Sequence, residues 1–572
     1  MTNTDSIFNS RQDNRIAFAV TVDGELLTDE VESVSTFFEV NGIPGATIIL
    51  TDGDMLTSNF ELSSQSRFYP GKTIEIKAGY QQATTVLFKG MIIRHSIRNR
   101  NYISKNLSGS SLTLECRHCL VKADLSTINT IFHHTSDSDV LSQILKKYGL
   151  SNVIDKTDHD FPELVQYRQT DWNFILQRAA ANGFVILPGI ENVFVGLPAI
   201  SAESKAMLRY GKTILDLDAE LDAQYQVNTI EYHAWDSDTQ ETVTVTDNLP
   251  EESAEITAAT GYVQSTMFHT GDLPELIMQR AVNAQKHHRN LAKKRGRVRC
   301  EGTSAIQIGD VISLSGTGST FDGKVLVTGI RHSLASGEWI TDLQFGLNPE
   351  ETEYAGHPAE QKSNPRGLYI GTVLQIENDP KSSERILVRI PSLNDREGIW
   401  ARLSVPDAGE GRGWTFWPDV NDEVIIGFLQ SDPGQPVVLG RLHSSKNPSP
   451  YPAENKNAIK GLKTRSGLEL VFDDDESSMT LKTQNGNTLK LNDKDSVLEI
   501  KDQHNNSIIL SDEGIKISSG KDLMLDAKGD VKIKGKEINV QASSEVSIAA
   551  KTGLSFSTNA VAKIKGNLIK LN

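Results

Sequence analysis

The amino-acid sequence predicts a mainly β, multidomain fold, and three observations lead to this class. A C-terminal repeat places apolar pairs at a short, regular spacing, which is typical of stacked strands. Ahead of it, residues 366–451 contain five short strand patterns with turn signals between them. The N-terminal part alternates like strands and carries a few helical signals. With 572 residues the chain is also longer than one hydrophobic core usually organises, so several domains are expected.

The most regular stretch is the C-terminal repeat, in which two apolar residues spaced two apart recur every seven or eight residues. Gly, Ser, Asn, Asp and Lys lie between the pairs and supply turns. A looser version begins near Leu468, so the repeat is predicted to span residues 460–572. The residues predicted to form the core of a needle are Leu523, Leu525, Val531, Ile533, Ile538, Val540, Val546, Ile548, Leu554, Phe556 and Ile564.

Each repeat unit is too small to bury its own apolar pair, so stability must come from stacking. A single-chain β-helix usually needs longer rungs, whereas a unit of about eight residues suits one strand and one corner, with three chains sharing each turn. We therefore expect an intertwined triple-stranded β-helix (β-prism), a stiff rod on the order of 50–60 Å long. A monomeric β-solenoid and an ordinary antiparallel sheet are the alternatives.

Residues 366–451 are predicted to form a small closed barrel of the OB type, because its strand count and strand lengths fit that fold. The strands are expected at 369–376, 385–390, 399–405, 423–429 and 436–442. Its core is expected to hold Trp400, Trp414, Phe416, Trp417 and Phe428. Some OB barrels bind single-stranded nucleic acid, but the basic residues here are interspersed with acids and the net charge is −16. Nucleic acid is therefore not an expected partner.

The N-terminal part is predicted to begin as β structure. Alternating apolar residues from Ile16 to Val22 precede an Asp23-Gly24 hairpin signal, and further strands are expected at 46–50, 73–78 and 84–93. The segments Ser136-Asp-Ser-Asp139 and Thr170-Asp171 are predicted to cap two helices, and a longer helix is expected from Pro274 to Lys294.

Several motifs of the chain resemble the VgrG family of type VI secretion systems and phage-tail-like particles, which is related to phage tail hub and needle proteins. In the barrel these motifs are Gly398-Ile-Trp-Ala-Arg402, Gly413-Trp-Thr-Phe-Trp-Pro418, Asp422–Leu429, Asp432–Arg441 and Asn447–Tyr451. In the N-terminal part, segments Phe88–Met91, Val165–Gly183, Gly309–Leu314 and Gly337–Asp342 fit the same family. The resemblance covers nearly the whole chain.

The resemblance implies three domains: a phage tail hub of two β-barrel-like folds with helical insertions at 1–355, an OB domain at 366–451 and an octapeptide-repeat needle at 460–572. It implies a homotrimeric structural spike that adapts a sixfold inner tube to a threefold needle and pierces the target envelope. The implied partners are the inner tube, baseplate proteins, a PAAR-type tip protein, effector cargo and the target-cell membrane. The platform for the tip protein is expected at Leu568, Ile569, Lys570, Leu571 and Asn572.

Three other motifs have a chemical and a structural interpretation. Cys116-Arg-His-Cys119 could hold a metal, but there is no second pair to complete a zinc site. Gly318–Lys324 matches most of a phosphate-binding loop, yet Val325 replaces the required Ser or Thr, so a hairpin turn is favoured. Asp473–Glu476 is interpreted as a solvated corner. No nucleophile signature is visible, and no catalytic, cofactor or metal residue is assigned.

The sequence shows no secretion signal and has only three cysteines, which favours assembly in the cytoplasm. The resemblance implies that the protein is then delivered, as part of an injection particle, to the extracellular space or a target cell on contraction. Two rival functions are an effector enzyme fused to a hub and a carbohydrate-binding tail spike. The sequence leaves open whether the machine is a type VI system, a released or anchored phage-like particle or a phage. It also leaves open the target cell, the cargo and a structural ion inside the needle.

Overall fold

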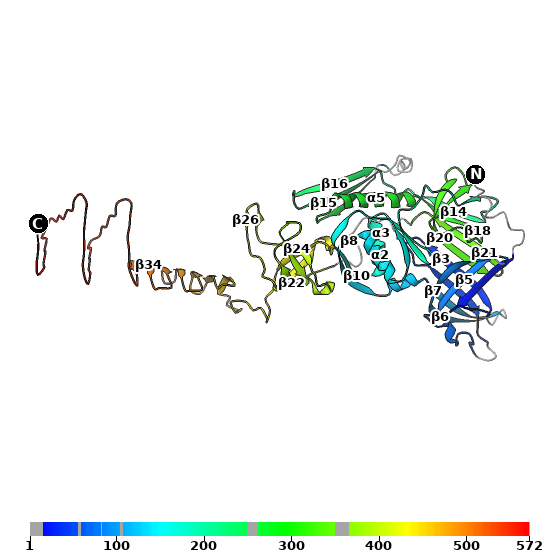
Figure 1. Cartoon of the computed structure of the whole chain (residues 1–572), viewed down its shortest axis with the longest axis horizontal. Helices are drawn as coiled ribbons and strands as arrows, with labels where there is room; N and C mark the ends of the chain where they lie inside the picture. Colours follow the sequence, from blue (N-terminus) through cyan, green and yellow to red (C-terminus); the bar gives the residue numbers. More distant parts are fainter. Residues whose placement is uncertain are drawn as a thin grey trace. The chain divides into compact units, whose positions relative to one another are not determined.

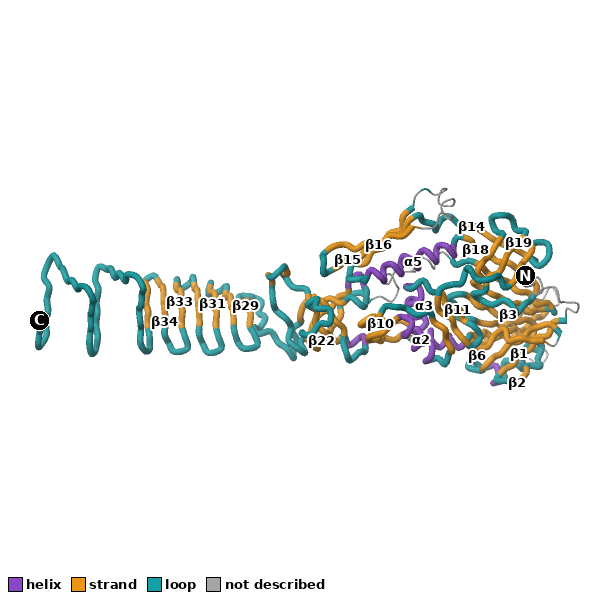
Figure 2. The backbone as a smooth tube through the Cα atoms, turned by 45° about the horizontal axis from the view of Figure 1, so that its top comes forward, coloured by secondary structure: helices purple, strands orange, loops and turns teal. Residues whose placement is uncertain are grey.

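The structure, a computed structural model, describes residues 15–54, 59–81, 83–102, 107–248, 261, 263–348 and 365–570. The chain divides into two compact units, Met1–His443 and Ser444–Asn572 (Figure 1). Strands outnumber helices in the described residues, as Figure 2 shows. The predicted mainly β class is therefore confirmed.

A large sheet forms the frame of the first unit. Its path runs β14-β18-β21-β20-β3-β4-β7-β6-β5-β1-β2, and β19 and β13 continue from β20. The strands of the sheet are β1 (Ile16–Val22), β2 (Glu25–Leu26), β3 (Val31–Glu39), β4 (Gly45–Thr51), β5 (Thr73–Tyr80), β6 (Ala83–Tyr102), β7 (Leu107–Arg117), β13 (Ala206–Arg209), β14 (Asp216–Leu221), β18 (Lys294–Glu301), β19 (Val311–Ser315), β20 (Gly323–Ala335) and β21 (Glu338–Phe345).

Local patterns located the early strands correctly. The predicted hairpin joins β1 to β2, and both turn residues take left-handed backbone angles, with φ of 48° at Asp23 and 85° at Gly24. The strands expected at 46–50, 73–78 and 84–93 lie within β4, β5 and β6. The sheet carries two separate hydrophobic cores, one around Phe88 and one around Phe345, so this part of the chain has two lobes.

The first insertion into this frame is an α/β module. It contains β8 (Thr127–Ser136), α2 (Asp137–Lys147), β9 (Ser151–Ile154), β10 (Asp160–Thr170), α3 (Asp171–Ala181), β11 (Val185–Pro188) and β12 (Asn192–Gly196). Both predicted caps are present, because the Ser136 hydroxyl accepts from the Asp139 amide and the Thr170 hydroxyl accepts from the Asn173 amide.

The second insertion is a three-stranded sheet packed on one helix. The sheet contains β15 (Thr229–Asp236), β16 (Glu241–Asn248) and β17 (Gln264–His269), in the order β16-β15-β17. The helix α5 (Glu275–Ala292) ends two residues before the predicted Lys294. Lys294 instead begins β18 and pairs with Leu221 of β14, so tertiary pairing overrides local helix propensity there.

Residues 369–441 form the predicted closed barrel. Its strands are β22 (Tyr369–Gln375), β23 (Arg385–Arg389), β24 (Ile399–Leu403), β27 (Glu423–Phe428) and β28 (Pro436–Arg441), and a small hairpin of β25 (Ala408–Gly409) and β26 (Arg412–Gly413) projects from it. The predicted aromatic core is wrong in part. Trp414 is 53% exposed and Phe416 is 43% exposed, because both follow the β25–β26 hairpin outside the barrel strands. The barrel core is aliphatic, with Val388 and Ile426 among its fully buried residues.

The second unit begins with a seven-stranded antiparallel meander. Its strands are β29 (Ile459–Lys463), β30 (Glu469–Asp473), β31 (Ser478–Lys482), β32 (Thr488–Asn492), β33 (Val497–Lys501), β34 (Ser507–Ser511) and β35 (Gly514–Ser518). This corrects the winding predicted for residues 460–518: the chain turns back on itself, which is the alternative of an ordinary antiparallel sheet. The reason is unit length, since four or five residues separate the strands as far as β34 and are enough for a tight turn.

Candidate functional site

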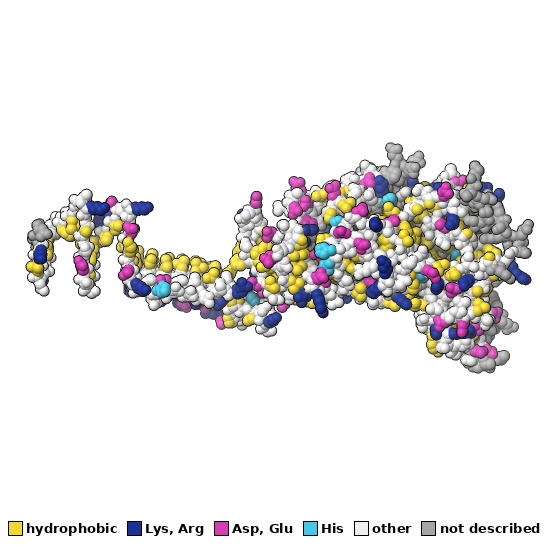
Figure 3. All heavy atoms as spheres, viewed as in Figure 1, with side chains coloured by type: hydrophobic (Ala, Val, Ile, Leu, Met, Phe, Trp, Pro, Cys, Tyr) yellow, Lys and Arg dark blue, Asp and Glu magenta, His cyan; other side chains and the backbone are white. Residues whose placement is uncertain are grey.

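The meander presents one apolar face whose side chains are exposed or half-buried within its own unit. Cross-strand neighbours on this face are apolar at every step from β30 to β35, for example Leu481 opposite Leu489 and Ile500 opposite Ile508. The residues of this face, here called the apolar face, are Leu470, Phe472, Met479, Leu481, Leu489, Leu491, Leu498, Ile500, Ile508, Leu510, Ile515 and Ile517. Figure 3 shows hydrophobic atoms gathered along one side of this sheet.

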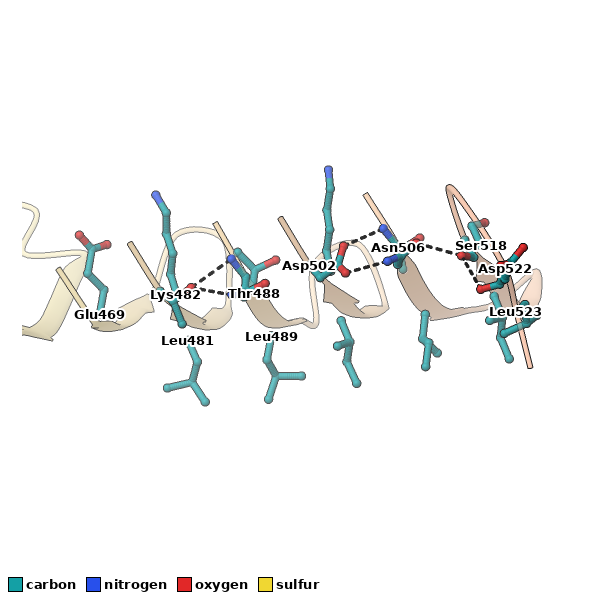
Figure 4. A pocket seen from close by; sticks show the side chains of 18 of the residues that line it. Glu469, Leu481, Lys482, Thr488, Leu489, Asp502, Asn506, Ser518, Asp522 and Leu523 are labelled. Carbon is teal, nitrogen blue, oxygen red and sulfur yellow. Dashed lines mark hydrogen bonds between the residues drawn. The ribbon is translucent and has the colours of Figure 1, made fainter. Parts of the chain in front are cut away.

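The opposite face of the meander is mostly polar. Ion pairs such as Lys463 with Glu469, 2.6 Å apart, lie on this side. Figure 4 shows Leu481 and Leu489 pointing to one side of the ribbon and Lys482 to the other. A groove of about 750 Å³ follows the sheet and continues to Leu523, the first residue of the predicted needle core. A sheet with one apolar and one polar face needs a second layer that packs against its apolar face.

Asparagine side chains connect successive turns at one edge of the meander. The Asn487 carboxamide oxygen accepts from the Gln503 amide at 3.0 Å. The Asn506 carboxamide oxygen accepts from the Gly520 amide at 2.9 Å. The Asn506 carboxamide nitrogen donates to Asp502 at 2.8 Å (Figure 4). The sequence prediction missed this ladder. A signal was present, because Asn487 and Asn506, which close these turns, are spaced 19 residues apart.

The predicted needle core lies after the meander. Residues 519–570 form no strand within the chain, and the eleven predicted core side chains are each 54–80% exposed. This differs from the meander because units of seven or eight residues leave too few residues for a strand and a reversing turn. The structure therefore does not bring these side chains together within one chain.

The predicted tip platform lies only partly within the described residues. Leu568 is 74% exposed, Ile569 is 51% exposed and Lys570 is also exposed. Leu571 and Asn572 lie outside the described residues.

The Cys-x-x-Cys motif spans a strand and a short helix. Cys116 is fully buried in β7, and burial raises the pKa of its thiol to about 12. Cys119 begins the 3₁₀ helix η2 (Cys119–Asp124), with its sulfur 3.7 Å from Nε2 of His118. Within the described ranges, no three His, Cys, Asp or Glu side chains converge as a metal site would require.

The two remaining motifs are turns. Gly318–Lys324 connects β19 to β20, whose residues Leu314 and Gly323 pair in antiparallel register, so the predicted hairpin turn is confirmed. In the acidic corner, Asp474 pairs with Lys460, and Glu476 lies 2.7 Å from Lys494. This pairing on the surface agrees with a solvated corner.

Matches to three family models follow the domain order of the chain. The model described as Alg8 N-terminal domain matches residues 12–336. The type VI secretion system/phage-baseplate injector OB domain matches residues 369–443, and the phage baseplate V C-terminal trimerisation domain matches residues 478–549. The two later matches coincide with the barrel and with part of the second unit.

Curated relatives match over shorter stretches. The type VI secretion system spike protein VgrG3 of Vibrio cholerae is 29% identical over 156 residues, which are 25% of this chain and 15% of that protein. VgrG1a of Pseudomonas aeruginosa is 33% identical over 73 residues, 13% of this chain and 11% of that protein. The actin cross-linking toxin VgrG1 of Vibrio cholerae matches over 14% of its length. The chain thus spans well under two thirds of these relatives.

A solved structure shares the fold over most of the chain. The Francisella PdpA-VgrG complex in its lidded form aligns with 88% of this chain and 80% of the matched chain, at a TM-score of 0.53 and 9% sequence identity. In the part of the chain that the structure describes, no helix is both long and apolar enough to cross a membrane.

Proposed function

The chain belongs to the family described as Alg8 N-terminal domain and is a VgrG-type spike protein, and from this premise we propose that it is the structural central spike of a contractile injection system. The observation that carries the proposal is the apolar face of the meander together with the unpaired repeat at 519–570. Both need further chains of the same kind to be covered.

Copies of the same chain that pack against the apolar face account for its exposed hydrophobic side chains, because they bury them. Leu481 and Ile500 are each more than 40% exposed in one chain. Burying a half-exposed Leu or Ile contributes roughly 1 kcal/mol, so twelve such residues contribute on the order of 10 kcal/mol per chain. A face-to-face pair of meanders would cover the face but leave the repeat at 519–570 without strand partners. Three chains around one axis cover both, with their meanders packed apolar face to apolar face and the repeat at 519–570 paired between chains, and the match to a trimerisation domain at residues 478–549 supports that number.

The hub is proposed to adapt the sixfold inner tube to the threefold needle. The two hydrophobic cores on the large sheet support this role, because three chains would present six lobes. The proposed partners are the inner tube, baseplate proteins, a tip protein of the PAAR type, effector cargo and the target membrane during puncture. Residues 568–572 are the proposed tip platform. No partnership with nucleic acid is proposed, and three arginines of the barrel pair with acids, at Asp379, Asp407 and Asp422.

The proposed role is mechanical and not catalytic. One relative bears the name of an actin cross-linking toxin, so a spike of this family can carry an effector. A glycan-binding spike is the other rival, and the repeat offers only Phe472 and Phe556 as aromatic side chains. Assembly in the cytoplasm, followed by delivery in the particle on contraction, completes the proposal.

The decisive experiment combines solution mass with particle assembly. Light scattering of the full-length chain is expected to give three times the chain mass. Leu489→Asp places a charge on the apolar face and is expected to abolish the trimer. Lys490→Asp, on the neighbouring residue of the polar face, is the matched control and is expected to leave the trimer intact.

The same variants test the function in the producing cell. Electron microscopy of contractile particles is expected to show assembly with the natural chain and with Lys490→Asp, and failure with Leu489→Asp. A monomeric natural chain, or particles that assemble and contract without this chain, would overturn the proposal.

A further inference from the structure

The barrel and the second insertion of the hub interlock through two loops of the first unit. The barrel loop 430–435 lies against the hub loop 269–272, and the hydrogen bonds run in both directions. The Thr270 amide donates to the Gln430 side chain at 3.1 Å, and the Gln430 side chain donates to the Phe268 carbonyl at 3.1 Å. The Gln435 side chain donates to the Asp272 carbonyl at 3.0 Å. These two loops, here called the joint, connect the hub to the barrel.

A buried histidine lies at the centre of the joint. Nε2 of His269 is 3.1 Å from Oδ2 of Asp432, and the two side chains are only 1% and 19% exposed. Nδ1 of the same ring is 3.0 Å from the carbonyl oxygen of Gly271 and 3.2 Å from the amide nitrogen of that glycine. The charged ring can donate at both nitrogens, and the neutral ring can donate to Asp432 while it accepts from the Gly271 amide. His269 therefore has partners in both protonation states.

The charged groups around His269 favour its protonated form. Burial alone would lower its pKa, but the hydrogen bond and charge of Asp432, together with the hydrogen bond to Gly271, outweigh burial, so the pKa is raised above its ordinary value. Asp272, on the same loop, acts in the same direction and itself accepts from the backbone and hydroxyl of Ser237. From β15, Tyr232 faces the same carboxylate. Burial and then Asp432 raise the pKa of that phenol, which keeps it neutral.

The barrel side of the joint is strained. Gln430 has φ of 49° and Ser431 has φ of 59°, which are left-handed values that non-glycine residues rarely adopt. Backbone of this kind persists only where surrounding contacts hold it. In the joint, favourable hydrogen bonds therefore hold a loop conformation that is unfavourable by itself.

We propose that the joint is a proton-controlled latch: protonated His269 holds the barrel loop 430–435 closed against the hub, and loss of that proton weakens the hold. Because the pKa of His269 is higher in the closed joint, the added stability is fully present below the ordinary histidine value of about 6.5. It is lost as the pH rises through the higher value of the closed joint. A spike so built has a tighter hub-to-barrel connection in acidic surroundings than in alkaline ones. This inference does not depend on the proposed injection role.

The first test measures the proton directly. Hydrogen exchange at the C2 position of the imidazole, followed by mass spectrometry of the full-length chain, gives the pKa of His269. The expected value lies above 6.5 in the natural chain and falls in Asp432→Asn, which removes the carboxylate charge. A value at or below 6.5 in the natural chain would overturn the latch.

The second test measures how strongly the barrel loop 430–435 is protected in the closed joint. Backbone amide exchange in the peptide covering 428–436, corrected for the intrinsic pH dependence, is expected to speed up by roughly tenfold between pH 6 and pH 9 in the natural chain. His269→Gln keeps hydrogen bonding without a titratable charge and is expected to abolish this pH dependence. His233→Gln, at an exposed hydrogen bond with Thr244 in the same sheet, is the matched control and should retain it.

The exchange of β4 in the same samples reports whether each variant keeps its fold. A pH dependence that persists in His269→Gln would show that another group controls the loop. If that variant fails to fold, Asp432→Asn and the natural chain alone still decide, because a flat pH profile in the natural chain contradicts the latch.

Discussion

The phenolic oxygens of Tyr167 on β10 and Tyr369 on β22 lie 2.7 Å apart and join the α/β module to the barrel. Their rings meet edge to face with centroids 5.9 Å apart, and Tyr369 makes a second such contact with Phe428. Burial, followed by the hydrogen bond from Tyr167, raises the pKa of Tyr369 to about 12. The Tyr369 hydroxyl therefore stays neutral in ordinary buffers, and both residues belong to the core of the barrel or pack against it.

Tyr369→Phe is expected to lower the free energy of unfolding by about 1 kcal/mol, because it removes the partly buried hydrogen bond to Tyr167 and a longer, exposed one to the Arg366 carbonyl while it leaves the ring in place. Denaturant titration of the full-length chain, read by tryptophan fluorescence, measures the change. Tyr167→Phe is expected to cost a similar amount, and the double variant should cost less than the sum of the two. Strictly additive effects would show that the two hydroxyls do not interact in solution.

The barrel should also lose stability in acid through Asp379. Burial alone would raise the pKa of this carboxyl, but hydrogen bonds from the Arg385 guanidinium and three backbone amides hold it at about 2. A carboxyl with a lowered pKa stabilises the fold above its ordinary value of 3.8, and this stabilisation is lost as the pH falls toward 2. Asp379→Asn is expected to cost about 2 kcal/mol at pH 7 and almost nothing at pH 2.

Urea titrations at pH 7, 4 and 2 check this pH dependence. Asp407→Asn is the matched control, because Asp407 pairs with Arg412 at 2.9 Å on the surface, where such pairs contribute about 0–1 kcal/mol. Equal effects of the two substitutions at all three pH values would contradict the assignment.

Sequence reasoning succeeded where the signal is local. The caps at Ser136 and Thr170, the Asp23-Gly24 hairpin and the strands of the barrel all depend on residues a few positions apart. The large sheet was not predictable in this way, because β3 pairs with β20 nearly three hundred residues later in the chain. Periodicity says that a strand has a buried face, but it does not name the strand beside it.

The C-terminal repeat shows the same limit of prediction from local sequence patterns. Alternation predicted the apolar face correctly, since Leu481 and Leu489 do lie on one side of the sheet. The direction of the chain after each strand depends on the length of the turn. The prediction applied the triple-stranded winding to the whole repeat, although the units of the meander are longer than the seven or eight residues of the units after it. Trp414 and Phe416 were assigned to the barrel core from residue type alone, without the hairpin that carries them outward.

A buried ion pair in the α/β module is expected to be a sensitive point. Nε of Arg178 on α3 donates to Asp137 of α2 at 2.5 Å, and Asn182 donates to the same carboxylate at 2.7 Å. The Asp137 side chain is 1% exposed. Arg178→Met would leave this charge buried without its main partner, at an expected cost of about 3–5 kcal/mol.

Chemical denaturation followed by far-ultraviolet circular dichroism measures the loss in Arg178→Met. Arg94→Met is the matched control, because Arg94 is 68% exposed in its pair with Glu115 and should contribute about 0–1 kcal/mol. A loss in Arg178→Met no larger than in the control would mean that Asp137 is solvated or neutral in the folded protein.

The asparagine ladder should control the passage from the meander to the repeat that follows it. Asn506 connects the turn after β33 to Gly520 and also accepts from the Ser519 hydroxyl at 3.0 Å. Asn506→Ala removes these bonds and is expected to lower the free energy of unfolding by about 1–2 kcal/mol, because each partly buried hydrogen bond contributes about 0.5–1.5 kcal/mol.

Amide exchange in peptides covering 515–530 should become faster in the full-length Asn506→Ala variant. His504→Ala, in the same turn, is the control, because the hydrogen bond of its ring goes to the neighbouring Gln503 and not to the start of the repeat. Equal exchange in both variants would mean that the ladder does not fix the start of the repeat and that contacts with other chains do so.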